Sequence, residues 1–176
     1  MTNQKSYSVT DLIKILNKPG LLYWANNIGL SGLSLHEQRN KLAKKGTKKH
    51  NEIQDFFVHG VDFKDSYKLK ESIKGYDVYS CEEDLSNGYI HGRSDLILLN
   101  NGKKIVCDFK SGSKIYLSTK LQLTAYKELS KSDEIAFISM DDYKLITIDI
   151  DHQKYLDIIK YLYKIKINLD TLNEKL

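Results

Sequence analysis

The clearest pattern of apolar and polar positions lies between residues 92 and 110, in the segment GRSDLILLNNGKKIVCDFK. Two apolar runs, residues 96–99 and 105–107, flank the pair Asn101-Gly102. An Asn-Gly pair between apolar runs is the strongest short-range signal for a β-hairpin turn. The pattern therefore predicts two antiparallel strands that meet at this pair.

Other apolar runs predict further strands. Residues 76–81 form one candidate strand, and residues 89–91 are the candidate beginning of the first hairpin strand. The alternating runs EIAFISM at 134–140 and KLITIDI at 144–150 predict two more strands. A tight polar turn at residues 141–143 would join them.

Capping residues predict three helices before these strands. Ser8 or Thr10 caps a short helix that Pro19-Gly20 ends, Ser34 caps a helix over residues 35–44, and Thr47 begins another that runs to residue 58. Residues 116–129 have helical spacing, and Asp151 caps a last helix with apolar residues Leu156, Ile159, Leu162 and Tyr163. This order of elements predicts a mixed-sheet α/β or α+β domain whose helices cover the sheet.

Length and composition are those of one ordinary globular domain, which we expect to span residues 1–176. No apolar run approaches the ~20 residues that cross a bilayer, and the first residues lack the apolar core of a secretory signal. We therefore expect a cytoplasmic protein without a membrane partner. Cys81 and Cys107 lie outside any CxxC arrangement, so we expect two small core residues rather than a disulfide framework or a zinc site.

The net charge of +4 is unevenly distributed, because the segment KLAKKGTKKH contains five lysines in ten residues. Clusters of this kind bind phosphates in many proteins. The alternative is a solvated lysine face that reflects a lysine-rich composition.

The predicted hairpin carries charge at one end. Strand side chains alternate between faces, so Asp108 and Lys110 share one face while Cys107 and Phe109 point to the other. Asp95 begins the first strand, which brings its carboxylate to the same end of the ladder as Asp108. Two adjacent carboxylates repel each other unless a cation lies between them, and Mg²⁺ prefers oxygen ligands. The alternative is an ordinary ion pair between these carboxylates and Lys110.

Polar side chains also point inward from two predicted helices. His50 shares a helical stripe with Ile53 and Phe57, which places its imidazole toward the core. Gln122 and Tyr126 lie four residues apart on one face of another helix. Without a metal nearby, each of these would be an ordinary hydrogen-bonded core residue.

Four motifs in one order resemble the RecB-like branch of the PD-(D/E)XK nuclease superfamily. They are GTKKH, GRSDLIL, DFK and QLTAY, and they span residues 46–126 on the expected helix, strand, strand and helix. The resemblance implies a restriction-endonuclease-like fold, an α/β domain with a central mixed sheet flanked by helices, whose motif-bearing core covers about residues 46–130. It also implies a Mg²⁺- or Mn²⁺-dependent deoxyribonuclease of DNA repair or recombination, most often an exonuclease.

The resemblance assigns a role to each matching residue. Lys110 would be the catalytic lysine beside Asp108 and Asp95, and the metal ligands would be His50, Asp95, Asp108 and the backbone carbonyl of Phe109. Gln122 and Tyr126 would position the DNA strand, with Tyr126 or nearby aromatic residues stacking on unpaired bases. The lysines before the histidine would contact phosphates: Lys41, Lys44, Lys45, Lys48 and Lys49.

The chain departs from the family pattern at two positions. Many relatives have Glu four residues after the histidine, where this chain has Gln54, which weakens the prediction of a second metal. An acidic residue upstream of the aspartate strand is usual, and either Glu82 or Glu83 could take that place. Two cysteines cannot supply the four-cysteine iron–sulfur cluster of some relatives. The alternatives to an exonuclease are an endonuclease of the same superfamily and a noncatalytic nucleic-acid-binding module.

Overall fold

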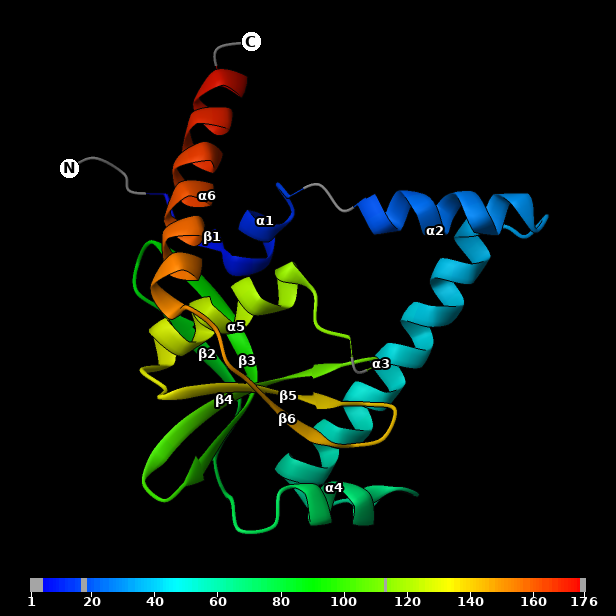
Figure 1. Ribbon diagram of the computed structural model, residues 1–176, viewed down its shortest axis with the longest axis vertical. Helices are drawn as coiled ribbons and strands as arrows, with labels where there is room; N and C mark the ends of the chain where they lie inside the picture. The colour runs from blue at the N-terminus through cyan, green and yellow to red at the C-terminus, as the bar shows by residue number, and fades with distance from the viewer. Residues whose placement is uncertain (1–4, 17–18, 113, 175–176) are drawn as a thin grey trace.

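A six-stranded mixed β-sheet lies at the centre of the computed structural model, which describes residues 5–16, 19–112 and 114–174 (Figure 1). The strands are β1 (Tyr7–Ser8), β2 (Asp77–Ser86), β3 (Ile90–Asn100), β4 (Lys103–Lys110), β5 (Glu134–Ser139) and β6 (Leu145–Ile148). Helices cover both faces of this sheet, so the predicted α/β class is confirmed, and the arrangement is compatible with a restriction-endonuclease-like sheet.

The strand β3 is the centre of the sheet topology. It pairs antiparallel with β2 along one edge, and along the other it pairs first with β1 in parallel and then with β4 antiparallel. The strand β5 continues the sheet parallel to β4, and β6 closes it antiparallel to β5. The predicted hairpin turn is confirmed, because Asn100 pairs with Lys103 and both Asn101 and Gly102 have positive φ, at 49° and 79°.

Six helices are described: α1 (Val9–Ile13), α2 (Pro19–Leu30), α3 (Leu35–His59), α4 (Ser66–Ser72), α5 (Leu117–Ser130) and α6 (His152–Asn173). Three predicted N-caps are confirmed. The side chains of Ser8, Ser34 and Asp151 each accept a hydrogen bond from a backbone N–H in the first turn of α1, α3 and α6. Each cap satisfies a donor that has no partner inside its helix.

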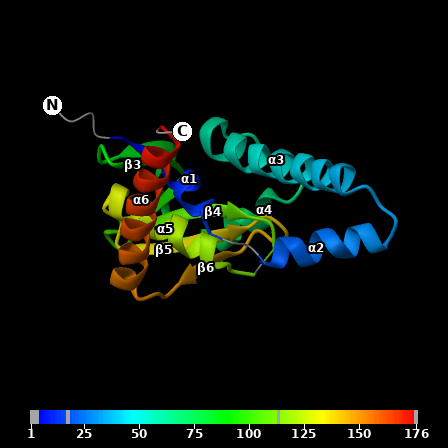
Figure 2. The same cartoon turned by 90° about the horizontal axis from the view of Figure 1, so that it is seen from above.

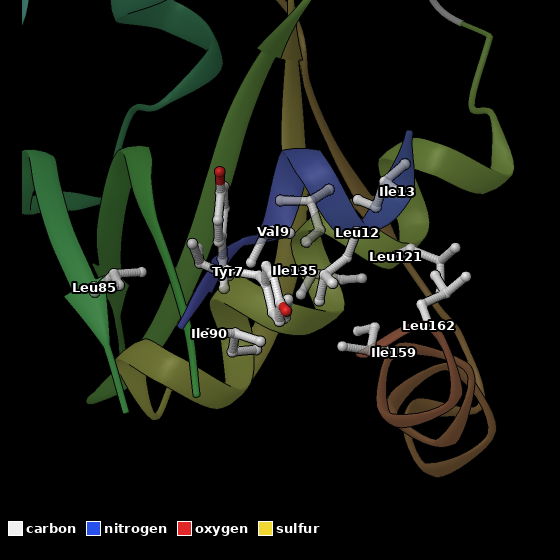
Figure 3. Close-up of a cluster of buried hydrophobic side chains, with 14 of the residues drawn as sticks. Tyr7, Val9, Leu12, Ile13, Leu85, Ile90, Leu121, Ile135, Ile159 and Leu162 are labelled. Carbon is white, nitrogen blue, oxygen red and sulfur yellow. The ribbon is translucent and has the colours of Figure 1, made fainter. Parts of the chain in front are cut away.

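Two apolar layers attach the helices to the sheet. On one face, residues of α1, α5 and α6 pack on Ile97, Val106 and Ile135, as the close-up in Figure 3 shows in part. On the other face, α3 and α4 pack on alternate residues of the same strands, among them Leu96 and Cys107. Cys81 lies partly buried beside this second layer, so both cysteines are packing residues as expected.

Two predicted helix boundaries are wrong. Pro19 begins α2 rather than ending the first helix, because a proline is tolerated at the first helical position, where its missing N–H has no partner. Thr47 does not begin a new helix, since α3 runs without a break from Leu35 to His59. A glycine inside a helix costs only ~1 kcal/mol relative to alanine, less than the unsatisfied backbone groups of a break at Gly46 would cost. The pattern also missed β1 and α4.

Residues 19–48, which we call the arm, comprise α2 and the first part of α3 and project away from the sheet (Figures 1 and 2). The arm contains five basic residues and one acidic residue, Glu37, although the whole chain has a net charge of only +4. Its surface also exposes large apolar side chains: Leu21, Leu22, Tyr23, Leu30, Leu33 and Leu42. Across the described ranges, no helix is both long and apolar enough to span a membrane.

Candidate metal-binding and hydrolytic site

Three acidic or imidazole side chains from α3, β2 and β3 converge where the β3–β4 ladder ends. The Nε2 atom of His50 lies 3.3 Å from Oδ1 of Asp95 and 3.8 Å from Oε1 of Glu82. One ligand atom from each residue lies within 4.8 Å of the other two. All three side chains are partly buried, so the cluster has limited access to water.

Packing of α3 on the sheet brings His50 to this position. Ile53, one turn later, is fully buried, and the His50 ring meets the Phe109 ring edge-on with 5.2 Å between centroids. The Phe57 ring stacks on the Phe109 ring. The predicted inward orientation of His50 is confirmed, because the same stripe that buries Ile53 turns the imidazole toward β3 and β4.

Asp95 links the cluster to β4. Its Oδ2 atom accepts a hydrogen bond from the Phe109 backbone N–H at 2.6 Å, while its Oδ1 atom faces His50. Asp95 and Asp108 therefore lie at the same end of the β3–β4 ladder, as predicted. Asp108 is not one of the three residues whose ligand atoms cluster most closely, and its role as a metal ligand stays a prediction. The role of the Phe109 backbone carbonyl as a metal ligand also stays a prediction.

The pairing of β2 with β3 places Glu82 in the cluster. Its neighbours Cys81 and Glu83 pair with Leu96 and Ser94, so Glu82 lies level with Asp95. Glu82 has a positive φ of 54°, an uncommon conformation for a residue with a side chain. Its Oε1 atom is buried and has no hydrogen-bond partner within the described residues. Glu83 instead accepts a hydrogen bond from Ser80, so Glu82 is the one of the two glutamates that lies in the cluster with His50 and Asp95.

The electrostatics of the cluster follow from burial and from the neighbouring charges. The hydrogen bond with Asp95 raises the pKa of His50, although partial burial opposes this effect. Burial raises the pKa of Glu82, and the negative charge of Asp95 raises it further. Burial also raises the pKa of Asp108 to about 7, with a further contribution from Asp95. Negative charge is therefore unfavourable here, and Lys110 offsets it only in part for Asp108.

A second set of polar side chains runs from β4 to α5 beside the cluster. Lys110 forms an ion pair with Asp108, and its Nζ atom donates a hydrogen bond to Oε1 of Gln122 at 3.1 Å. Gln122 in turn donates from Nε2 to the Tyr126 hydroxyl at 3.2 Å. The residues of the DFK and QLTAY motifs thus form one connected chain, and this chain holds the Lys110 ammonium in place.

The first position of the GRSD motif, Gly92, has no room for a side chain. A Cβ atom on Gly92 would lie 2.6 Å from a ring carbon of Tyr126, closer than real contacts allow. The glycine therefore makes room for the tyrosine ring against β3. This packing fixes the hydroxyl that Gln122 contacts.

The geometry bears on two predicted roles. The Tyr126 side chain is buried, with 3% of the residue exposed, so no ring face is open for stacking on a base in this conformation. The Tyr126 hydroxyl contacts Gln122 instead, and a role of the pair in positioning DNA stays a prediction. Lys49 donates to the Met140 carbonyl at 2.6 Å and to Asp141 Oδ1 at 2.8 Å, so its ammonium has protein acceptors and its predicted phosphate contact stays untested. These acceptors come from the β5–β6 turn, which the lysine-rich pattern does not reveal.

The other lysines of the basic segment are exposed on α3. Four of them face solvent: Lys41, Lys44, Lys45 and Lys48. The Nζ atom of Lys48 lies 3.8 Å from Oε1 of Glu52. Their phosphate-binding role stays a prediction. Glu82 is the site residue that the sequence could not single out, because no sequence signal marks a glutamate with positive φ inside a strand.

The donor set of the cluster suits a divalent cation. Carboxylate oxygens are the preferred ligands of Mg²⁺ and Mn²⁺, whereas an imidazole nitrogen also suits Zn²⁺, iron and nickel. The unpartnered Glu82 oxygen and the clustering of acidic groups are the features that a bound cation would satisfy. His50, Glu82 and Asp95 are the residues that would hold it.

No protein-family model matches the chain, and no curated protein matches it. Among solved structures, the chain is similar to that of SSO0001, with 18% sequence identity and a TM-score of 0.47. The match covers 94% of this chain and 78% of that one. The α/β assignment stands on the strand order and the helix layers described above.

Proposed function

We propose that the protein is a metal-dependent nuclease that hydrolyses DNA phosphodiester bonds, with Mg²⁺ or Mn²⁺ held by His50, Glu82 and Asp95. One observation carries the proposal. Glu82 has an unfavourable backbone conformation and directs a buried oxygen without a hydrogen-bond partner among the described residues toward His50 and Asp95. Strained residues of this kind cluster at functional sites.

The chemistry assigned to this site divides between the cation and the chain. A divalent ion bound there would lower the pKa of a bound water and polarise a phosphate oxygen. Lys110 supplies a fixed positive charge beside the cluster, because Asp108 and Gln122 hold its ammonium from two sides. A charge fixed in advance stabilises a transition state without reorganisation during the reaction. Lys110 therefore offsets the negative charge that builds on the attacked phosphate.

An exonuclease is the form of the proposal that the sequence resemblance favours. Purified protein incubated with end-labelled linear DNA and with circular single-stranded DNA, in Mg²⁺, Mn²⁺ or EDTA, tests it directly. We expect degradation of linear DNA that requires the metal, with circles left intact. Cleavage of circles would assign an endonuclease instead, and binding without cleavage under every metal condition would assign a noncatalytic module.

Metal binding is tested separately by calorimetry with Mn²⁺. We expect that Glu82→Gln and Asp108→Ala each abolish or strongly weaken the binding, because each removes a charged oxygen from the site or its border. Asp77→Ala is a matched control, because Asp77 is an exposed carboxylate at the start of the same strand as Glu82. Unchanged Mn²⁺ affinity in Glu82→Gln would contradict the assignment of the cluster.

A further inference from the structure

A chain of hydrogen bonds connects the two elements that carry the candidate site. The Met140 N–H donates to the Lys110 carbonyl at 2.8 Å, and the Met140 carbonyl accepts from Lys49 Nζ at 2.6 Å. Lys49 precedes His50 on α3, and Lys110 ends β4. The backbone of Met140 therefore bridges the lysine of the sheet and the helix of the histidine.

Lys49 has a second acceptor in the same turn. Its ammonium lies 2.8 Å from Asp141 Oδ1, and the Lys49 side chain is only 22% exposed. Asp141 also lies beside the loop that follows Lys110, since a Cβ atom on Gly112 would be 3.9 Å from its Oδ2 atom. The lysine thus makes a polar contact with the β5–β6 turn, whereas Ile53 and Phe57 attach the next turns of α3 by apolar packing.

Apolar packing and polar contacts constrain a helix differently. Packed side chains such as Ile53 hold α3 against the sheet, but apolar contacts are non-directional and allow small rotations and shifts along the helix axis. Two hydrogen bonds from one ammonium fix a direction and a distance. We propose that Lys49 is a positioning residue, which sets the orientation of α3 so that the His50 imidazole faces Asp95 and Glu82.

This inference rests on the proposed function, because the cluster that Lys49 orients is the one assigned to the metal. It also replaces the role in phosphate binding that the sequence pattern suggests for Lys49. Lys45, one turn earlier on α3, is the lysine with which we compare Lys49. Lys45 is exposed, and no hydrogen bond or ion pair of its ammonium is found among the described residues.

Three variants test the inference in the full chain. Lys49→Met keeps an unbranched stem and removes the ammonium, Lys49→Arg keeps a cationic donor, and Lys45→Met is the matched control. Mn²⁺ affinity is measured by calorimetry, and only for variants whose urea unfolding curves show a fully folded protein. Residues that orient metal ligands typically change metal affinity by about 10- to 100-fold, so we expect Lys49→Met to bind Mn²⁺ about tenfold or more weakly. We expect Lys49→Arg to recover most of this affinity and Lys45→Met to bind Mn²⁺ as the parent does.

Two further measurements distinguish the possible outcomes. Hydrogen exchange of the α3 backbone amides at residues 46–54 should be faster in Lys49→Met than in Lys45→Met. DNA affinity in EDTA should keep the same salt dependence in Lys49→Met as in the parent. Equal Mn²⁺ affinity and equal exchange in the two methionine variants would overturn the inference, as would a reduced salt slope in Lys49→Met with unchanged Mn²⁺ affinity. A parent protein that binds no Mn²⁺ would refute the proposed function, and the exchange rates alone would then decide the positioning role.

Discussion

Lys110 is the residue on which the proposed chemistry depends most. Its ammonium is held between Asp108 and Gln122, and Gln122 is held in turn by the buried Tyr126. The charge is thus fixed before any substrate arrives. This arrangement is the one expected of a group that acts on a transition state rather than on ground-state binding.

We therefore predict that Lys110→Ala lowers the cleavage rate by roughly 10²-fold or more, since one well-placed electrostatic group is typically worth ~3 kcal/mol in the transition state. DNA affinity should change far less. Single-turnover cleavage assays with a separate binding titration measure the two effects. Lys110→Met keeps the packing of the stem and controls for the smaller volume of alanine. Folded variants that cut DNA as fast as the parent would exclude a catalytic role.

The residues of the site differ in how far the sequence could predict them. Strand alternation correctly placed Asp108 and Lys110 on one face, because the period of a strand is two residues. Helical spacing correctly joined Gln122 to Tyr126. The choice of Glu82 over Glu83 depends on a positive φ that no local pattern encodes. The acceptor of Lys49 could not be predicted either, because Met140 lies 91 residues away in the sequence.

At the scale of the elements, the two parts of α3 have different surroundings. Its second part packs on the sheet and presents His50, while its first part belongs to the projecting arm and carries exposed lysines (Figure 1). A single continuous helix joins them. The exposed lysines and His50 therefore lie along one helix axis.

We predict that the exposed lysines of α3 contact phosphates. Replacing Lys44, Lys45 and Lys48 by Gln should reduce the salt slope of DNA binding by about 0.7 to 0.9 for each phosphate that is no longer neutralised, because each neutralised phosphate releases condensed counterions. Affinity measured across a range of salt concentrations gives the slope. The same replacements at Lys154, Lys160 and Lys164, exposed residues of α6, form the control. If both triple variants retain the parent slope, the lysines of α3 are a solvated face.

Turns and helix ends were predicted more reliably where the residues at the boundary itself determine the structure. The Asn101-Gly102 turn and the caps Ser8, Ser34 and Asp151 depend on local chemistry, and all four are confirmed. The break at Gly46 and Thr47 was predicted on the same local grounds and is wrong. A helix continues through such residues when ending it would leave more backbone groups without partners.

At the scale of the whole molecule, the candidate site acts against the stability of the metal-free protein. Asp108 is almost fully buried, and its pKa is raised to about 7 from an ordinary 3.8, first by burial and then by the charge of Asp95. A carboxyl whose pKa is higher in the folded state stabilises that state only when protonated. Its contribution is therefore present at low pH and disappears as the pH rises through about 7.

We predict that Asp108→Asn makes the metal-free protein more stable at pH 8, on the order of 1 kcal/mol, because a neutral amide removes the cost of a buried charge. The gain should shrink toward pH 5, where the parent carboxyl is itself protonated. Urea unfolding in EDTA at both pH values measures the difference. A less stable Asp108→Asn protein at pH 8 would mean that the ion pair with Lys110 outweighs the cost of burial.

Lys5 and Tyr7 contact α6, so the N-terminal residues cannot complete their packing early in synthesis. The Tyr7 hydroxyl donates to Asp170 at 2.8 Å, the Tyr163 hydroxyl donates to the Lys5 carbonyl at 2.9 Å, and β1 pairs with β3. Tyr7 is therefore synthesised 163 residues before Asp170, and Lys5 158 residues before Tyr163. Contacts between residues so far apart in sequence slow folding, and partly folded chains expose apolar surface until these contacts form. On the nascent chain, Val9, Leu12 and Ile13 stay without their complete set of neighbours until α6 has emerged.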